Sequence, residues 1–194
     1  MQRAAEIERM TKETKISLSI QLDGAGRAEI CTGIPFFDHM LSLMTAHGFF
    51  DIRLHATGDL DVDYHHTVED VGIVLGEGIR KALGDFAGIR RFGEATVPMD
   101  EALSTVVVDT SGRPWLVYRV EVKGRIRDFD VHLVESFFKA LTDHAGLTLH
   151  VNLLYGKNLH HIFESIFKGF GRALDQASAV DKRRSGVPST KGRL

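Results

Sequence analysis

The sequence predicts an α+β fold built from two copies of one unit. Residues 65–69 (HHTVE) recur as residues 160–164 (HHIFE), an offset of 95 residues in a chain of 194. Strand-like and helix-like segments are mixed, without the regular alternation that is typical of a parallel doubly wound sheet. An offset close to half the chain indicates a tandem duplication, with halves near 11–95 and 96–180.

Each half contains strands with a period of two and helices with a period near 3.6. In the first half, residues 15–22 alternate as a half-buried strand, a turn at Asp23-Gly24 follows, and residues 27–32 are expected to be its partner strand. Pro35 can open a helix, and residues 36–47 carry apolar residues at helical spacing up to Gly48. The remaining elements predicted for this half are strands near 50–56 and 60–63 and a helix over about 66–84.

The second half repeats this pattern and ends in a tail. Its predicted elements are strands at 104–109, 115–122 and 147–154, with helices at 130–145 and 160–179. Residues 181–194 are basic and rich in Gly, Pro and Ser, so an extended segment is expected there. No linker separates two domain-sized parts, and the chain is therefore predicted to be one domain over 1–194.

Composition narrows the class of protein. Hydrophobic residues make up 43% of the chain and charged residues 26%, and the formal net charge of -2 gives no reason to expect nucleic acid or an anionic membrane as partner. Cys31 is the only cysteine, no apolar run reaches the length of a membrane span, and residues 1–15 lack the apolar core of a signal peptide. These observations predict a cytoplasmic location.

The repeated HHxxE motif has the geometry of a metal-binding motif. On a helix, Glu69 lies on the same face as His65 and His66, and the second copy places Glu164 in the same relation to His160 and His161. Adjacent imidazoles diverge, so one histidine can join the glutamate at one ion while its neighbour points to another. Two copies supply enough ligands for two sites, each drawing on both halves.

A single histidine on an apolar face is usually a hydrogen-bonded core residue, but that explanation does not fit two adjacent pairs at one offset. Burying adjacent imidazoles beside a carboxylate twice costs desolvation energy, which metal bonds offset. Imidazole and carboxylate ligands without thiolate exclude a zinc finger and leave Mn, Fe, Co, Ni or Zn open.

Six motifs also resemble the signature blocks of the imidazoleglycerol-phosphate dehydratase family, in order and at its spacing, from about Thr11 to the C-terminus. They are GIPFFDHML (33–41), GDLDVDYHHTVED (58–70), VPMDEA (97–102), SGRP (111–114), YGKNLHHIFE (155–164) and VPSTKG (187–192). The resemblance implies a fold like the second domain of ribosomal protein S5, duplicated, with helices packed between two mixed four-stranded sheets.

The resemblance also implies a centre with two Mn²⁺ ions and no organic cofactor. The metal ligands carried over are His39, His65, His66, Glu69, His160, His161 and Glu164. The family commonly has one more histidine where this chain has Ser136. His132 lies one helical turn earlier on the same face, so it is either a replacement ligand or a surface histidine.

The implied reaction is the dehydration of imidazoleglycerol phosphate to imidazole acetol phosphate in histidine biosynthesis, through a metal-bound imidazolate. Such an enzyme is a carbon–oxygen hydro-lyase. Glu13 matches the family's acid/base glutamate, which also contacts substrate, and the residues alone suggest only a surface carboxylate. Glu69 and Glu164 can share proton transfer, and the sequence does not divide the roles among the three.

A phosphorylated substrate needs converging cations. The resemblance assigns the phosphate to Arg91, Arg113, Lys168, Ser189 and Lys191, which includes two residues of the tail, and it makes His47 a further substrate contact. Arg90, Arg183 and Arg184 are expected to be exposed cations. His55, His144 and His150 are expected to be structural, with His55 and His150 packed at equivalent strand positions.

The family further implies a homo-oligomer, in which trimers assemble into a shell of 24 subunits and neighbouring chains share metal ligands.

Three other functions compete with the dehydratase. A di-metal hydrolase of a small phosphorylated substrate would use a carboxylate bridging two close ions. A metal-stapled assembly protein would have no use for the phosphate-type cations of the tail. An RNA-binding module would need a basic, aromatic surface, which the composition does not favour.

Overall fold

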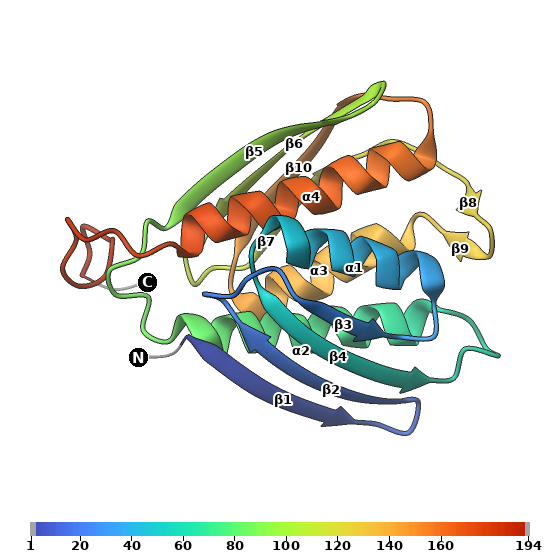
Figure 1. The fold of residues 1–194 in the computed structure, drawn as a ribbon, viewed down its shortest axis with the longest axis horizontal. Coiled ribbons are helices and arrows are strands. Elements are labelled where there is room, and N and C mark those ends of the chain that lie inside the picture. Colours follow the sequence, from blue (N-terminus) through green and yellow to red (C-terminus); the bar gives the residue numbers. More distant parts are fainter. Residues whose placement is uncertain (1–2, 193–194) are drawn as a thin grey trace.

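The computed structural model describes residues 3–192 and has the predicted α+β architecture. Two four-stranded sheets form the outer layers, with strand orders β1-β2-β4-β3 and β5-β6-β10-β7, and four long helices lie between them (Figure 1). Each sheet is mixed, because β3 pairs in parallel with β4 and β7 pairs in parallel with β10, while the other neighbours are antiparallel.

The two halves share one topology. The first consists of β1 (Ala4–Met10), β2 (Thr14–Gln21), β3 (Ala28–Cys31), α1 (Pro35–His47), β4 (Asp51–Gly58) and α2 (His65–Leu83). The second consists of β5 (Phe92–Met99), β6 (Ala102–Asp109), β7 (Trp115–Arg119), α3 (Leu133–Ala145), β10 (Thr148–Tyr155) and α4 (Leu159–Ser178), with the small hairpin of β8 (Arg125–Ile126) and β9 (Phe129–Asp130) inserted before α3. Reading both sheets in sequence order gives the same arrangement twice, so the duplication is a property of the fold.

Three details of the first half differ from the sequence prediction. The strand at 27–32 does not pair with β2, because β4 lies between them and β3 pairs with β4. Residues 60–63 form a turn and not a strand, since the chain must reverse there to enter α2. Strand β1 is absent from the sequence prediction, because it lies at the edge of the sheet and nearly all of its residues are exposed or half-buried.

Helices pair across the two halves. Helix α1 packs on α4, and α2 packs on α3. Glycines permit this close approach: a Cβ at Gly171 on α4 would lie 2.3 Å from the Met44 backbone oxygen of α1. The equivalent residue of α2, Gly76, would place a Cβ 2.6 Å from the Leu141 backbone oxygen of α3. Both HHxxE helices are therefore seated directly on the backbone of a helix from the other half.

The core between the helices is aromatic. Phe37 of α1, Phe137 and Phe138 of α3, and Phe167 and Phe170 of α4 are all fully buried, and their rings contact one another at centroid distances of 5.1–5.7 Å. This packing fixes the helices so that their N-termini lie at one end of the molecule, on the right of Figure 1. The start of β1 and the tail from residue 181 to residue 192 lie at the opposite end. No helix between residues 3 and 192 combines the length and the apolar character needed to cross a membrane.

Candidate functional site

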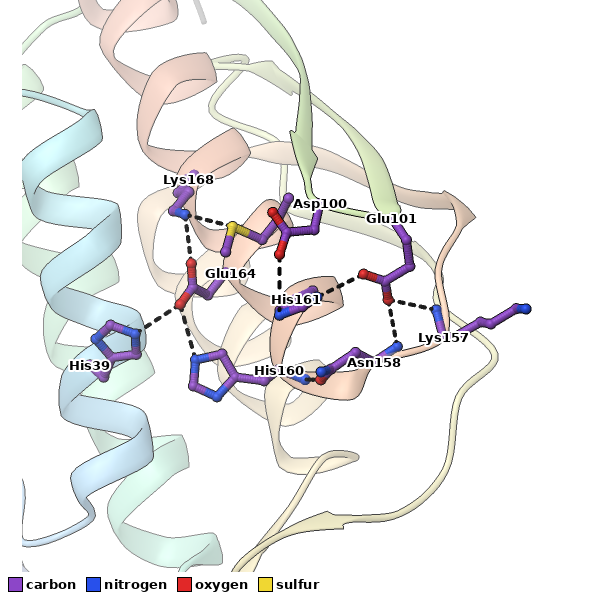
Figure 2. A network of polar contacts seen from close by, with 10 residues as sticks. His39, Asp100, Glu101, Lys157, Asn158, His160, His161, Glu164 and Lys168 are labelled. Carbon is purple, nitrogen blue, oxygen red and sulfur yellow. Dashed lines mark hydrogen bonds and ion pairs between the residues drawn. The ribbon is translucent and has the colours of Figure 1, made fainter.

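A group of three potential metal ligands forms where α1 meets α4. His39 Nε2 and His160 Nε2 each lie 3.0 Å from Glu164 Oε1 (Figure 2). Among the described residues, only these three offer ligand atoms that all lie within 4.8 Å of one another. His39 comes from the first half of the chain and the other two from the second, so the pairing of α1 with α4 creates the group.

Glu164 is the largely buried member of this group. Burial alone would raise the pKa of its carboxyl, but hydrogen bonds from Lys168 and His39 outweigh that effect and bring the pKa to about 2. The Lys168 ammonium donates to Glu164 Oε2 at 2.6 Å, which leaves Oε1 facing the two imidazoles. Glu164 is therefore a carboxylate at neutral pH, as a metal ligand must be.

The other copy of the motif forms a less complete group on α2. His65 Nε2 lies 3.5 Å from Glu69 Oε2. His65 and His132 both line a cavity of about 360 Å³ between the start of α2, the start of α3 and the β8–β9 hairpin. His132 bonds through Nδ1 to Asp130 at 2.7 Å and is two-thirds exposed, so the cavity brings it near His65 without placing it in a three-ligand group.

The second histidine of each motif turns away from the glutamate of its own helix. The rings of His65 and His66 are nearly perpendicular, at 79°. His66 Nδ1 lies 3.0 Å from Asp59 Oδ2 and 3.9 Å from Glu13 Oε2. His161 Nδ1 lies 2.7 Å from Glu101 Oε2, and Figure 2 shows its ring pointing to the β5–β6 turn and not to His160.

These carboxylates change the protonation of the rings. The hydrogen bond to Asp59 raises the pKa of His66, and the hydrogen bond to Glu101 raises the pKa of His161. Glu101 in turn has its pKa lowered to about 2, first by His161 and then by the backbone N–H of Asn158. Because a carboxylate only accepts hydrogen bonds, each ring must carry its proton on Nδ1 when it is neutral.

Sequence reasoning assigned no role to Asp59, Asp100 or Glu101. Asp100 Oδ2 approaches His161 Nε2 at 3.8 Å, so both acids of the β5–β6 turn face this histidine. The available signal was their position: Asp59 lies in the motif at 58–70, and Asp100 and Glu101 lie in the motif at 97–102. Neither motif shows by spacing that these acids contact histidines.

Glu13 is placed at the helix N-termini by the β1–β2 turn. Thr11 Oγ1 accepts hydrogen bonds from the backbone N–H groups of Glu13 and Thr14, at 3.0 and 2.9 Å. Thr14 Oγ1 donates to buried Asp70 of α2 at 2.5 Å, and Arg9 also donates to Asp70 at 3.0 Å. This network fastens the turn to α2, so Glu13 lies beside His66.

The predicted phosphate residues divide into two places. Arg91 donates to both carboxylate oxygens of Asp109, at 2.7 and 3.1 Å, and to the Pro188 carbonyl at 2.9 Å. Arg91 and Ser189 line a second cavity of about 520 Å³ at the tail end of the molecule. Arg113 is exposed in the loop after β6, near the same end. Lys191 is exposed in the tail.

Lys168 and His47 lie nearer the metal-ligand group. Besides Glu164, the Lys168 ammonium contacts Met99 Sδ at 3.3 Å. His47, at the end of α1, has its pKa lowered first by burial and then by the positive charges of Lys168 and Arg172. A neutral His47 beside a lysine can contact substrate without adding a second full charge.

Two of the histidines expected to be structural do not have the predicted surroundings. His55 and His150 are exposed on the outer faces of the two sheets and not packed. Their positions in the two sheets are also not equivalent. Asp51, the first residue of β4, pairs with the last residue of β2, and Thr148, the first residue of β10, pairs with the last residue of β6, so Asp51 and Thr148 correspond. His150 therefore corresponds to Arg53, two residues before His55.

Comparison with known proteins identifies the family of the chain. A sequence model of the imidazoleglycerol-phosphate dehydratase family matches residues 32–174. The imidazoleglycerol-phosphate dehydratase of Geobacter sulfurreducens is 58% identical over the whole of both chains, and that of Azorhizobium caulinodans is 58% identical over 99% of this chain and 98% of its own.

Solved structures extend the agreement to the fold. The imidazoleglycerol-phosphate dehydratase of Staphylococcus aureus superposes with a TM-score of 0.83 at 38% identity, over 92% of this chain and 99% of the other. That of Pyrococcus furiosus superposes with a TM-score of 0.85 at 40% identity, over 97% of this chain and all of the other. Identity at this level over nearly complete chains shows that the chain belongs to the imidazoleglycerol-phosphate dehydratase family.

Proposed function

We propose that this protein is a lyase that dehydrates imidazoleglycerol phosphate to imidazole acetol phosphate in histidine biosynthesis. Family membership supports the reaction, and the group of His39, His160 and Glu164 is the single observation on which the proposed mechanism rests. Loss of a hydroxyl next to an imidazole requires electrons from the ring, and a neutral imidazole supplies them poorly. A group that favours the anionic ring is therefore needed at the active site.

The residues present fit divalent cations. Two imidazole nitrogens and one carboxylate oxygen within 4.8 Å of one another are the donors that Mn²⁺ and its neighbours accept. Divalent cations held by these residues would supply positive charge beside the substrate's ring and so stabilise its anionic form. In this proposal the ligands are His39, His65, His66, Glu69, His132, His160, His161 and Glu164, the metal is Mn²⁺ with two ions per active site, and no organic cofactor takes part.

The chain's own acids then move the protons. Glu13 is exposed and held beside His66 by the β1–β2 turn, so its carboxylate can exchange a proton with a substrate carbon at that site. Glu69 and Glu164 act next to the ions, and Glu164 in particular stays ionised because Lys168 donates to it. Lys168 and His47 bind substrate from the side of α1 and α4.

The phosphate group requires a second chain. Arg91 N donates to the Ala177 carbonyl at 2.9 Å, and Ala177 lies 13 residues beyond Glu164 on α4, about 20 Å along the helix axis. A substrate with three carbons between ring and phosphate cannot span that distance. Arg91, Arg113, Ser189 and Lys191 of one chain therefore bind the phosphate of a substrate held by the ligands of another.

This arrangement supports a homo-oligomer, and we extend the proposal to trimers that form a shell of 24 subunits in the cytoplasm. Each chain is one domain with repeats near 11–95 and 96–180, and its tail, 181–194, contributes to the phosphate site. Residues 193–194 of that tail, like residues 1–2, lie outside the described residues.

Elemental analysis paired with an assay of the acetol product tests this proposal. The purified protein should carry Mn²⁺, turn over imidazoleglycerol phosphate, and lose activity together with particle size when a chelator removes the metal. Added Mn²⁺ should restore both properties. An enzyme that remains active and fully assembled after complete chelation would refute the metal centre.

A further inference from the structure

The β1–β2 and β5–β6 hairpins are structural equivalents that carry a glutamate at the same place. The Cα pairs of the first run from Ala4↔Gln21 to Met10↔Lys15, and those of the second run from Phe92↔Asp109 to Met99↔Ala102. Adding 88 to each residue number of the first ladder reproduces the register of the second. Glu13 therefore corresponds to Glu101.

The two glutamates make different contacts with the second histidine of the neighbouring motif. Glu101 Oε2 bonds to His161 Nδ1 at 2.7 Å, whereas Glu13 Oε2 lies 3.9 Å from His66 Nδ1. In the first half, Asp59 takes the bond to His66 Nδ1 at 3.0 Å. Tyr155 pairs with Leu103 after the bulge in β10, as Thr57 pairs with Lys15, so Asp59 corresponds to Lys157. A lysine side chain cannot accept the ring proton as Asp59 does.

We propose that Glu101 and Asp59 are positioning residues that determine which ring nitrogen of His161 and His66 is available to bind a metal ion. Because Asp59 takes the hydrogen bond of His66, the catalytic Glu13 stays free of that ring. The inference rests on the proposed function, because it takes these histidines as metal ligands and Glu13 as the acid/base group. A carboxylate on Nδ1 fixes the proton there, so Nε2 keeps its lone pair for an ion and the ring has one orientation.

The remaining contacts of Glu101 fit a positioning role. Its Oε1 accepts hydrogen bonds from the backbone N–H groups of Asn158 and Lys157, at 2.7 and 3.2 Å, which ties the loop before α4 to the hairpin (Figure 2). Both oxygens of Glu101 are thus engaged, one by the loop and the other by His161, so the side chain is held in one place. Two carboxylates in one hairpin position have thus taken separate roles.

Substitution by glutamine separates these roles. In Glu101→Gln, the side-chain oxygen can still accept from Asn158 and Lys157, but an amide N–H facing His161 cannot accept the Nδ1 proton, so the ring turns or changes tautomer. We expect Mn²⁺ to bind about 10–100-fold more weakly. Turnover should recover towards the wild-type value when Mn²⁺ saturates the site. Asp59→Asn should weaken Mn²⁺ binding in the same way through His66.

The experiment compares Mn²⁺ titrations by calorimetry for the chelator-stripped full chain and three glutamine variants. Glu13→Gln should keep the wild-type Mn²⁺ affinity and lose kcat, which is the opposite of the result for Glu101→Gln. Glu94→Gln, an exposed change in the same hairpin, is the matched control and should alter neither quantity. Unfolding temperatures of the stripped proteins verify that all variants fold.

Each outcome has one meaning. Wild-type Mn²⁺ affinity in Glu101→Gln, or equal loss of affinity in Glu13→Gln, would overturn the positioning role while leaving the metal centre intact. A wild-type protein that binds no Mn²⁺ would instead overturn the proposed function, and this inference with it.

Discussion

Gly171 sets the distance between α1 and α4, and replacing it with alanine should damage the metal-ligand group from two helical turns away. A Cβ at this position would lie 2.3 Å from the Met44 backbone oxygen and 3.0 Å from the Gly48 nitrogen. Ordinary contact begins at 3.4 Å, so the helices must separate by about 1 Å. Backbone atoms of a packed helix cannot turn aside as a side chain would.

The separation acts directly on the ligands. His39 lies on α1 and Glu164 on α4, with 3.0 Å between Nε2 and Oε1. An opening of about 1 Å would lengthen that distance to roughly 4 Å, which exceeds the tolerance of a metal site, about 0.5 Å. We expect Mn²⁺ affinity to fall at least about tenfold. Overpacking costs about 1–3 kcal/mol and better helix propensity returns about 1 kcal/mol, so Tm should fall by about 2–4 °C.

Gly169→Ala is the matched control on the same helix. Its Cβ would face the sheet, where the nearest atom is a Val106 methyl group at 3.0 Å and the nearest backbone atom lies at 3.8 Å, so it would not push α1 and α4 apart. The substitution gains the same helix propensity. Mn²⁺ titration and thermal unfolding of both variants provide the test. If Gly171→Ala bound Mn²⁺ as tightly as Gly169→Ala and unfolded no earlier, the helix spacing would not control the ligand geometry.

Three further outcomes can be measured. The pKa of His47 is lowered in the folded protein, so below the ordinary histidine pKa of 6.5 the unfolded chain binds a proton that the folded chain does not, and the free energy of unfolding should decrease in acid. His47→Gln should make this decrease smaller in urea titrations between pH 7 and 5. The same decrease in the variant as in the wild type would contradict this prediction. Lys191→Ala should raise KM more than it lowers kcat, as loss of a phosphate contact does, and an unchanged KM would remove the tail from the site. Ser136→His should tighten Mn²⁺ binding beside His65, and no change in affinity would indicate that His132 already serves there.

Much of the fold could be predicted from the sequence, because buried faces leave a periodic pattern. The predicted helices at 36–47, 66–84 and 160–179 agree with α1, α2 and α4 to within about a residue at each end. The sequence of β1 shows little pattern because it lies at a sheet edge and carries several charged residues. In β5 the buried positions hold the small residues Gly93 and Ala95 while Phe92 is exposed, so its alternation is hidden in the sequence. Strand order was not predictable either: β3 and β2 are neighbours in sequence, but β4 inserts between them.

The candidate site was predictable only in part, for a related reason. Spacing on one helix relates His160 to Glu164, and a repeated motif relates the two halves. Spacing says nothing about which helix packs on which, so the contact of His39 with Glu164 had to come from the structure. The same holds for Glu101, whose sequence position lies 60 residues from the histidine it contacts.

Pairing of helices between halves has a consequence for how such a chain could arise. A single unit contains one histidine helix and one HHxxE helix, but these do not face each other within the unit, because α1 meets α4 and α2 meets α3. An unfused ancestor could have built its ion sites only as a dimer with two identical sites. Fusion into one chain removes that identity, so position 39 can hold a histidine while the equivalent position in the other half, 136, holds a serine.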